Sequence, residues 1–226
     1  MRRNTIIILV IVIAILLIAA AVVVPLPATA PESAESPLPI TSPAADQGSS
    51  TILPEPTASP SPSVDALQQP VAEFAARITK KPFGILITAQ NSPVQPERFE
   101  GYHTGADVEY DDITEDVPVK AITAGTVLQS HTASGYGGVI AIQHEINGEP
   151  VVAIYGHLDP KSLVKTGTTL QAGQQIGILG DDKSSETDGE RKHLHFALLP
   201  GTKVDLRGYV ANKSDLSLWQ NPLTLF

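Results

Sequence analysis

The stretch VIAIQHEINGEPVVAIYG, residues 139–156, decides the fold class. Its two halves, 139–144 and 151–156, are rich in β-branched residues, and Asn147-Gly148 between them is typical of a hairpin turn. The sequence predicts further strands over 83–88, 117–122, 125–130, 174–179 and 193–199. The segments between these runs are too short for helical crossovers. We therefore expect residues 80–226 to form an all-β domain with a compact, mostly antiparallel sheet.

The N-terminal part of the chain has the features of a membrane span. Residues 5–24 carry no charge and are almost entirely aliphatic, and Arg2 and Arg3 precede them. Twenty helical residues cover about 30 Å, the thickness of a bilayer's hydrocarbon core. The arginines predict a single-pass anchor with residues 1–4 in the cytoplasm and the remainder outside. The alternative is a signal peptide cleaved near Ala30, which would release a secreted protein.

A spacer and a short helix are expected between this span and the β domain. Residues 25–63 consist mainly of Pro, Ser, Ala and Thr, which cannot bury enough apolar surface to offset the entropy of ordering. They predict a disordered linker. Over residues 64–79, Val71, Phe74, Ala75 and Ile78 have helical spacing, so a short amphipathic helix packed on the domain is predicted.

Composition limits the chemistry that the chain can perform. The 15 Lys and Arg against 24 Asp and Glu give a net charge of −9, which argues against a nucleic-acid partner. There is no cysteine, so disulfides and thiolate metal sites are excluded. A metal ion would have to be held by imidazoles and carboxylates.

The histidines are clustered in the sequence of the β domain. All six lie between Tyr102 and Phe196. His193 and His195 are two residues apart on a predicted strand, so they point to the same face, about 6.6–6.8 Å apart. Both could ligate one metal ion, or one could ligate while the other reaches water or substrate.

Two other motifs can complete a site with this pair. His103 and Asp107 are joined by Thr-Gly-Ala, and the glycine permits a sharp bend that would bring an imidazole beside a carboxylate. His157 follows the strand predicted at 151–156. Together the three elements match a zinc site with two histidines, one aspartate and an open fourth position, in which the two remaining histidines serve proton transfer.

The order of these motifs resembles a known family. His-x-x-x-Asp at 103–107, Tyr-x-His-Leu at 155–158 and His-Leu-His-Phe at 193–196 are similar to the LytM/lysostaphin-like zinc metalloendopeptidases of bacterial cell walls. The segments 116–127 and 164–177 resemble the family's "Gly-x-Pro-Val-x-Ala…Gly-x-Val" and "Val-x-x-Gly-x-x-Val-x-x-Gly-Gln-x-Ile-Gly" runs. The resemblance covers about Tyr102 to Leu199, nearly the whole β region.

The resemblance implies roles for individual residues. His103, Asp107 and His195 would bind one Zn²⁺ per domain, and His157 and His193 would be the catalytic pair. It also implies the duplicated-hybrid-motif type of β fold, a groove above the metal, and a substrate peptide within peptidoglycan.

The sequence departs from the family pattern in two places. Residues 181–192 form a longer and highly charged loop before His-x-His, which we expect to overhang the groove and to affect substrate choice. The tail from Val204 extends beyond the shared core, and its Trp219, Leu223 and Phe226 are expected to pack on the domain.

Two alternative functions stay open at the level of sequence. Some members of the family have lost metal ligands and act as binding or activating modules for other wall hydrolases, although this chain keeps all five positions. A second alternative is a site with three histidine ligands in which Asp107 only orients one of them.

Overall fold

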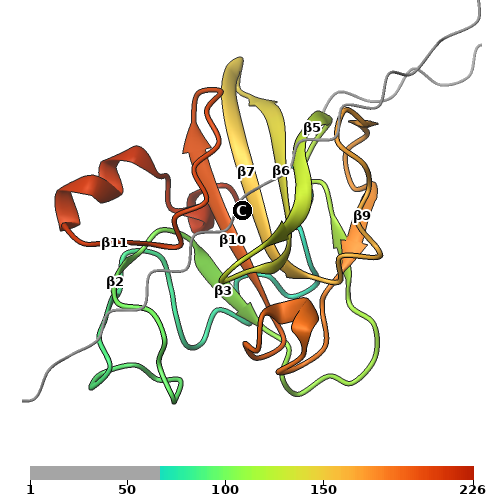
Figure 1. Cartoon of the computed structure of the whole chain (residues 1–226). Helices are drawn as coiled ribbons and strands as arrows, with labels where there is room; N and C mark the ends of the chain where they lie inside the picture. The colour runs from blue at the N-terminus through green and yellow to red at the C-terminus, as the bar shows by residue number, and fades with distance from the viewer. Residues whose placement is uncertain (1–66) are drawn as a thin grey trace, which may run out of the picture. The chain divides into compact units, whose positions relative to one another are not determined.

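The structure, a computed structural model, describes residues 67–226, and these residues form an antiparallel β domain (Figure 1). Every strand pairing within this range is antiparallel. The strands are β1 (Leu86–Ile87), β2 (Gly101–His103), β3 (Ala106–Glu109), β4 (Pro118–Lys120), β5 (Gly125–Ala133), β6 (Gly137–Ile146), β7 (Glu149–Leu158), β8 (Thr169–Leu170), β9 (Gln175–Ile178), β10 (His193–Pro200) and β11 (Tyr209–Val210). Three short 3₁₀ helices accompany them: η1 (Ser185–Thr187), η2 (Lys213–Leu218) and η3 (Pro222–Thr224).

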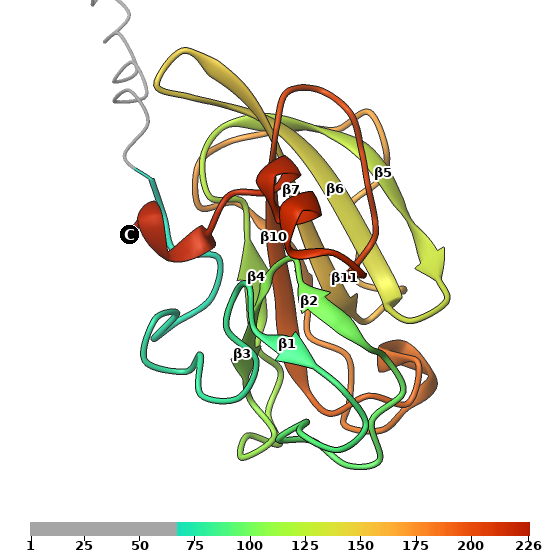
Figure 2. The same ribbon diagram turned by 90° about the vertical axis from the view of Figure 1, so that its left-hand side faces the viewer.

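The strands form three sheets. The largest has the order β3-β10-β7-β6-β5-β8, and smaller sheets have the orders β1-β2-β11 and β4-β9. In Figure 2, β1, β2 and β11 lie together in front of β10 and β7 of the large sheet. The small three-stranded sheet therefore covers one face of the large sheet near β10.

Alternation along β10 separates a hydrophobic face from a polar one. Leu194, Phe196 and Leu198 point into the main apolar core. His193 and His195 are 2% and 3% exposed and lie on the opposite face, where Ala197 and Leu199 join a second apolar cluster. The same strand thus carries core residues on one side and the candidate site on the other, as expected from a period of two.

The strands predicted from the sequence are confirmed, although 83–88 contributes only the two-residue β1. The short strands β2, β3, β8 and β11 were not predicted. The predicted helix over 64–79 is wrong for its described part, because residues 67–79 contain turns and no helix. Glu73 has a left-handed φ of 53°, which interrupts helical geometry. Val71 and Phe74 nevertheless pack into the main core, as expected.

Some predictions fall outside or near the edge of the described part. The membrane span at 5–24 and the linker at 25–63 lie outside the described residues. Among residues 67–226, no helix is sufficiently long and apolar to cross a bilayer. In the C-terminal tail, Trp219 is buried as expected, whereas Leu223 and Phe226 are partly exposed at 36% and 38%, and the ring of Phe226 packs edge-on against that of Phe74.

Candidate metal centre

A tight connection between two sheets brings His103 close to Asp107. His103 ends β2 and Asp107 is the second residue of β3, so the chain crosses from the three-stranded to the six-stranded sheet within Thr104-Gly105. A Cβ at Gly105 would lie 2.6 Å from the carbonyl oxygen of Phe196 and 2.8 Å from Nε2 of His195. Only glycine therefore permits this turn to pack directly against β10.

Strand register places the remaining ligand candidate beside them. His195 of β10 is paired with Asp107 on β3 and with Gly156 on β7. The side chains of His103, Asp107 and His195 consequently converge in one place, where they are at most 3% exposed.

Three ligand atoms form a nearly equilateral triangle. Nε2 of His103 lies 3.1 Å from Nδ1 of His195 and 3.2 Å from Oδ1 of Asp107, and Nδ1 of His195 lies 3.1 Å from the same oxygen. Among residues 67–226, these three residues form a group that could hold a metal ion, since their ligand atoms all lie within 4.8 Å of one another.

The donor set fits a zinc ion. Four ligands placed tetrahedrally at about 2.0–2.1 Å from zinc lie about 3.3–3.4 Å from one another, close to the sides of the triangle. Nδ1 of His103 donates to the carbonyl oxygen of Pro82 at 3.3 Å, so its Nε2 is left as an unprotonated donor for a metal. The three atoms can occupy three corners of a tetrahedron around a metal ion, and the fourth corner is left for water or substrate.

His157 reaches this site because β7 is irregular at its end. By strict alternation His157 would share the face of Tyr155, which points into the main core. A register shift between Gly138 and Val139 of β6 and a left-handed φ of 62° at His157 turn its side chain to the opposite face. A non-glycine residue in this conformation costs of order 1–3 kcal/mol and is characteristic of functional sites.

The charged loop orients both candidate catalytic histidines. Nδ1 of His157 donates to the carbonyl oxygen of Thr187 at 3.2 Å, and Nδ1 of His193 donates to that of Arg191 at 2.8 Å. The two rings lie 4.2 Å apart between centroids. In the neutral form, each imidazole therefore carries its proton on Nδ1, and Nε2 of His193 lies 3.4 Å from Oδ2 of Asp107.

Burial and charge tune these groups toward the protonation states that a metal site requires. Burial lowers the pKa of His195 to about 4, and burial together with His193 lowers the pKa of His157 well below its usual value. In the metal-free protein, burial raises the pKa of Asp107, but the adjacent imidazoles of His103 and His193 outweigh burial and keep that pKa well below normal. His157 and His195 are thus neutral and Asp107 is ionised at neutral pH.

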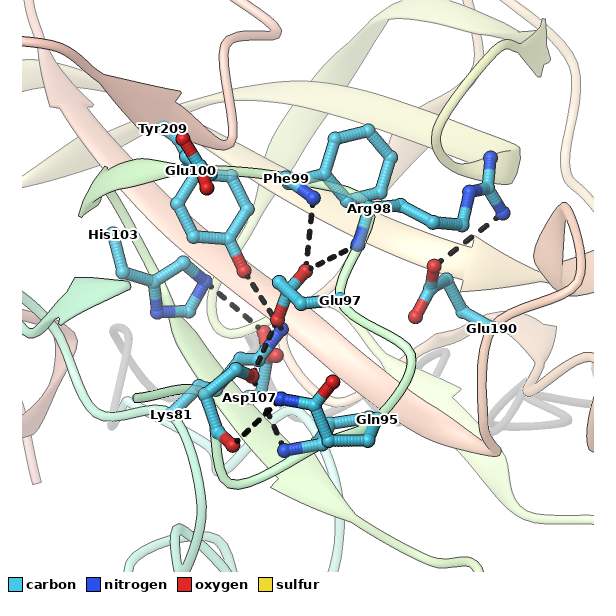
Figure 3. A network of polar contacts seen from close by, with 12 residues as sticks. Lys81, Gln95, Glu97, Arg98, Phe99, Glu100, His103, Asp107, Glu190 and Tyr209 are labelled. Atoms are coloured by element: carbon cyan, nitrogen blue, oxygen red, sulfur yellow. Dashed lines mark hydrogen bonds and ion pairs between the residues drawn. The ribbon is translucent and has the colours of Figure 1, made fainter. Parts of the chain in front are cut away.

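His157, His193 and His195 line a pocket. Ion pairs join the loops that border this pocket (Figure 3). Arg98 is bound to Asp188 and to Glu190 of the charged loop, and Oδ2 of Asp188 also accepts from the backbone of Gly135 at 2.9 Å. The loop was expected to overhang the groove. Glu190 does border the pocket, but Thr187 is fully buried, so the loop also supports the site from the side.

A buried ion pair fixes the segment in front of the site. Lys81 and Glu97, both 2% exposed in their side chains, are joined at 2.7 Å, and Lys81 also donates to the hydroxyl of Tyr209 at 3.1 Å (Figure 3). The ring of Tyr209 contacts both Phe99 and His103. The backbone carbonyl of Lys81 accepts from the amide of Asp107 at 3.0 Å, which ties this segment to β3.

Three residues of the site were not found by sequence reasoning. The ring of Tyr136 packs on His157 and His195, and a side chain at Gly156 would collide with it. Arg191 and Tyr209 lie in segments that carry no strand or motif signal. His144, in contrast, binds Ala124 and Tyr155 on the core side of the sheet and is not part of the site.

Comparison with known proteins gives the relationships of this domain. Residues 101–206 match the family model of peptidase family M23. Endolysin 2638A of Staphylococcus phage 2638A is 35% identical over 102 residues, 44% of this chain and 19% of the endolysin. The murein hydrolase activator EnvC of Escherichia coli is 34% identical over 85 residues, 38% of this chain and 18% of EnvC.

Among solved structures, the catalytic domain of the antimicrobial peptidase lysostaphin from Staphylococcus simulans is similar. It is 24% identical with a TM-score of 0.41, over 64% of this chain and 86% of that domain. The chain spans about a fifth of the length of the two curated relatives above.

Proposed function

Through residues 101–206 the chain belongs to peptidase family M23, the LytM/lysostaphin-like peptidases, and from this premise we propose that it is a zinc-dependent endopeptidase of peptidoglycan. It would hydrolyse peptide bonds in the stem peptides or cross-bridges. The observation that carries the proposal is the buried triangle of His103, Asp107 and His195, with two oriented imidazoles beside it. A phage endolysin and a murein hydrolase activator among its relatives support a cell-wall substrate.

The residues of the site divide into a metal-holding set and a proton-handling set. His103, Asp107 and His195 would hold zinc through Nε2, Oδ1 and Nδ1. Zinc bound there supplies a Lewis acid that polarises the scissile carbonyl and acidifies water.

His157 and His193 would handle the protons. Because each donates its Nδ1–H to a backbone carbonyl, each presents an Nε2 lone pair that accepts a proton from the attacking water. The resulting imidazolium donates to the developing oxyanion or to the leaving amine. Two rings 4.2 Å apart allow one to act as base while the other stabilises charge.

We also propose that the domain works outside the cytoplasmic membrane. Peptidoglycan lies there, and residues 5–24 have the length and apolar composition of a single-pass anchor. Cleavage near Ala30 would instead secrete the same domain.

The test uses the full chain. Zinc content is measured first, and the protein is then incubated with cross-linked peptidoglycans of different stem and bridge composition, with the released peptides identified by mass spectrometry. We expect stoichiometric zinc and cleavage of one class of bond. His193→Ala should remove cleavage, and His131→Ala, an exposed histidine on β5, serves as the matched control. Equal cleavage by wild type and His193→Ala would refute the proposed role.

A second candidate is a module that activates another hydrolase without cleaving peptides itself. The relationship to EnvC, which is named as an activator, favours it. The intact set of five residues favours the enzyme. If the zinc-loaded wild type leaves every peptidoglycan intact, yet stimulates a partner hydrolase, the second candidate is correct.

A further inference from the structure

One buried cation touches the carboxylate of the candidate metal centre. The guanidinium of Arg191 is 6% exposed and donates from Nη2 to Oδ2 of Asp107 at 2.9 Å. Arg191 lies in the charged loop, immediately outside β10, where the resemblance to wall peptidases is weakest. Its side chain has no part in the chemistry assigned to the five site residues.

The two oxygens of Asp107 have separate partners. Oδ1 faces His103 and His195 and completes the triangle, whereas Oδ2 faces Arg191 and Nε2 of His193. Nothing intrinsic to an aspartate fixes this division, because rotation about its last side-chain bond is broad. The guanidinium therefore determines which oxygen is available to a metal.

Arg191 is itself held by a second carboxylate. Nε and Nη2 donate to Oε2 and Oε1 of Glu109 at 2.7 and 2.6 Å, a two-pronged contact that fixes the guanidinium plane. Glu109 is two residues after Asp107 on β3, so it points to the same face. Lys80 lies 3.4 Å from Glu109 and partly shares this charge.

The charges of this arrangement are suited to a neighbouring cation. An unpaired arginine beside the triangle would repel a divalent ion. Glu109 cancels the charge of Arg191, so the negative charge of Asp107 is left for the metal. The pair can thus orient Asp107 without opposing metal binding.

We propose that Arg191, anchored by Glu109, is a positioning residue that presents Oδ1 of Asp107 to the metal as a single-oxygen ligand. The proposal rests on the proposed function in that it takes zinc as the ion. The same residue binds His193 through its backbone carbonyl, and a side-chain substitution leaves that contact intact. Replacing the side chain therefore isolates its effect on Asp107.

The test measures metal affinity of the full chain by competition with a chelator. Loss of a residue that supports a metal ligand typically weakens metal affinity about 10- to 100-fold, and this is the result expected for Arg191→Met. Arg191→Lys should not restore affinity, because a lysine cannot bind both carboxylates in the same plane. Lys192→Met is the matched control. It removes a buried cation next in sequence whose Nζ donates to the carbonyl oxygen of Glu115, and it keeps the backbone amide that donates to Oδ1 of Asp182. Zinc affinity should stay within about twofold.

A spectroscopic measurement separates positioning from a general structural role. With Co²⁺ in place of zinc, the wild type should show the strong visible absorption of a four-coordinate ion. In Arg191→Met the freed carboxylate can bind through both oxygens, so the absorption should weaken as the coordination number rises. An unchanged spectrum and an unchanged zinc affinity in folded Arg191→Met would overturn the proposal.

Two further variants keep the outcome unambiguous. If Arg191→Met does not fold, Glu109→Gln removes the anchor instead, and it should weaken zinc binding while unchanged affinity would contradict the proposal. Asp107→Ala tests the centre itself. If wild type binds zinc and Asp107→Ala does not, the metal centre is correct whatever Arg191 does, whereas a wild type without zinc affinity would refute the proposed function.

Discussion

The left-handed backbone of His157 gives a prediction in which glycine and alanine change their usual order of stability. His157 has a φ of 62° and carries its side chain to the metal face only in that conformation. Replacing it by alanine keeps a Cβ in an unfavourable region, whereas replacing it by glycine removes the Cβ. Both variants lose the imidazole and its contact with Thr187. The difference in their stability therefore measures the conformational cost of the backbone alone.

The size of the effect follows from two opposing contributions. A Cβ in the left-handed region costs about 1–2 kcal/mol, which favours glycine. The greater freedom of glycine in the unfolded chain costs about 0.5–1 kcal/mol, which favours alanine. His157→Gly should therefore be more stable than His157→Ala by about 0.5–1 kcal/mol. At Gln143, in the regular part of β6, only the second contribution operates, so Gln143→Ala should be the more stable of its pair.

The assay is urea unfolding of the four metal-free variants, followed by tryptophan fluorescence of Trp219. We compare the difference in the free energy of unfolding between the Gly and Ala variants at position 157 with the same difference at position 143. The two differences should have opposite signs. If alanine is the more stable residue at both positions, the backbone of His157 is not strained and the account of its orientation is wrong.

Three other predictions concern the centre itself. Asp107→Asn should lose more zinc affinity than the about 10- to 100-fold seen when only a supporting residue is removed, and retention of zinc in a chelator titration would favour a site with three histidine ligands. His195 alone should make the metal-free protein lose about 3 kcal/mol of stability as pH falls from about 6.5 to about 4. Burial lowers the pKa of His195 to about 4 in the folded protein, so the unfolded chain takes up the proton first and the stabilisation present above pH 6.5 disappears. Urea midpoints across this range should fall less steeply in His195→Gln. Gly105→Ala should cost about 1–3 kcal/mol through overpacking and should also weaken zinc binding, because its Cβ would meet His195 at 2.8 Å; wild-type values for both would contradict the packing described.

The sequence was informative where the β signal is long or regular. The hairpin of β6 and β7 follows from two β-branched runs joined by Asn147-Gly148, and the spacing of two along β10 placed His193 and His195 on one face. Strands as short as β2 and β3, with three and four residues, give no such pattern. The glycine between them nevertheless signalled the bend.

Other parts of the site depend on long-range packing that no local pattern records. Alternation alone places His157 on the wrong face, because the register shift in β6 arises from pairing between strands. Arg191 resembles any charged loop residue in sequence, and its partner Glu109 is 82 positions away. The predicted helix at 64–79 was based on apolar spacing. That spacing gives no sign of the left-handed backbone conformation of Glu73, which interrupts helical geometry.

The two hydrogen bonds that His157 and His193 donate to the carbonyls of Thr187 and Arg191 have a consequence for inhibition. Because one short segment fixes the rings of His157 and His193 together, a molecule that wedges this segment away from the sheet would misalign both at once. Such a compound would not need a zinc-chelating group. Its selectivity would come from residues 181–192, a charged loop that departs from the family pattern in sequence.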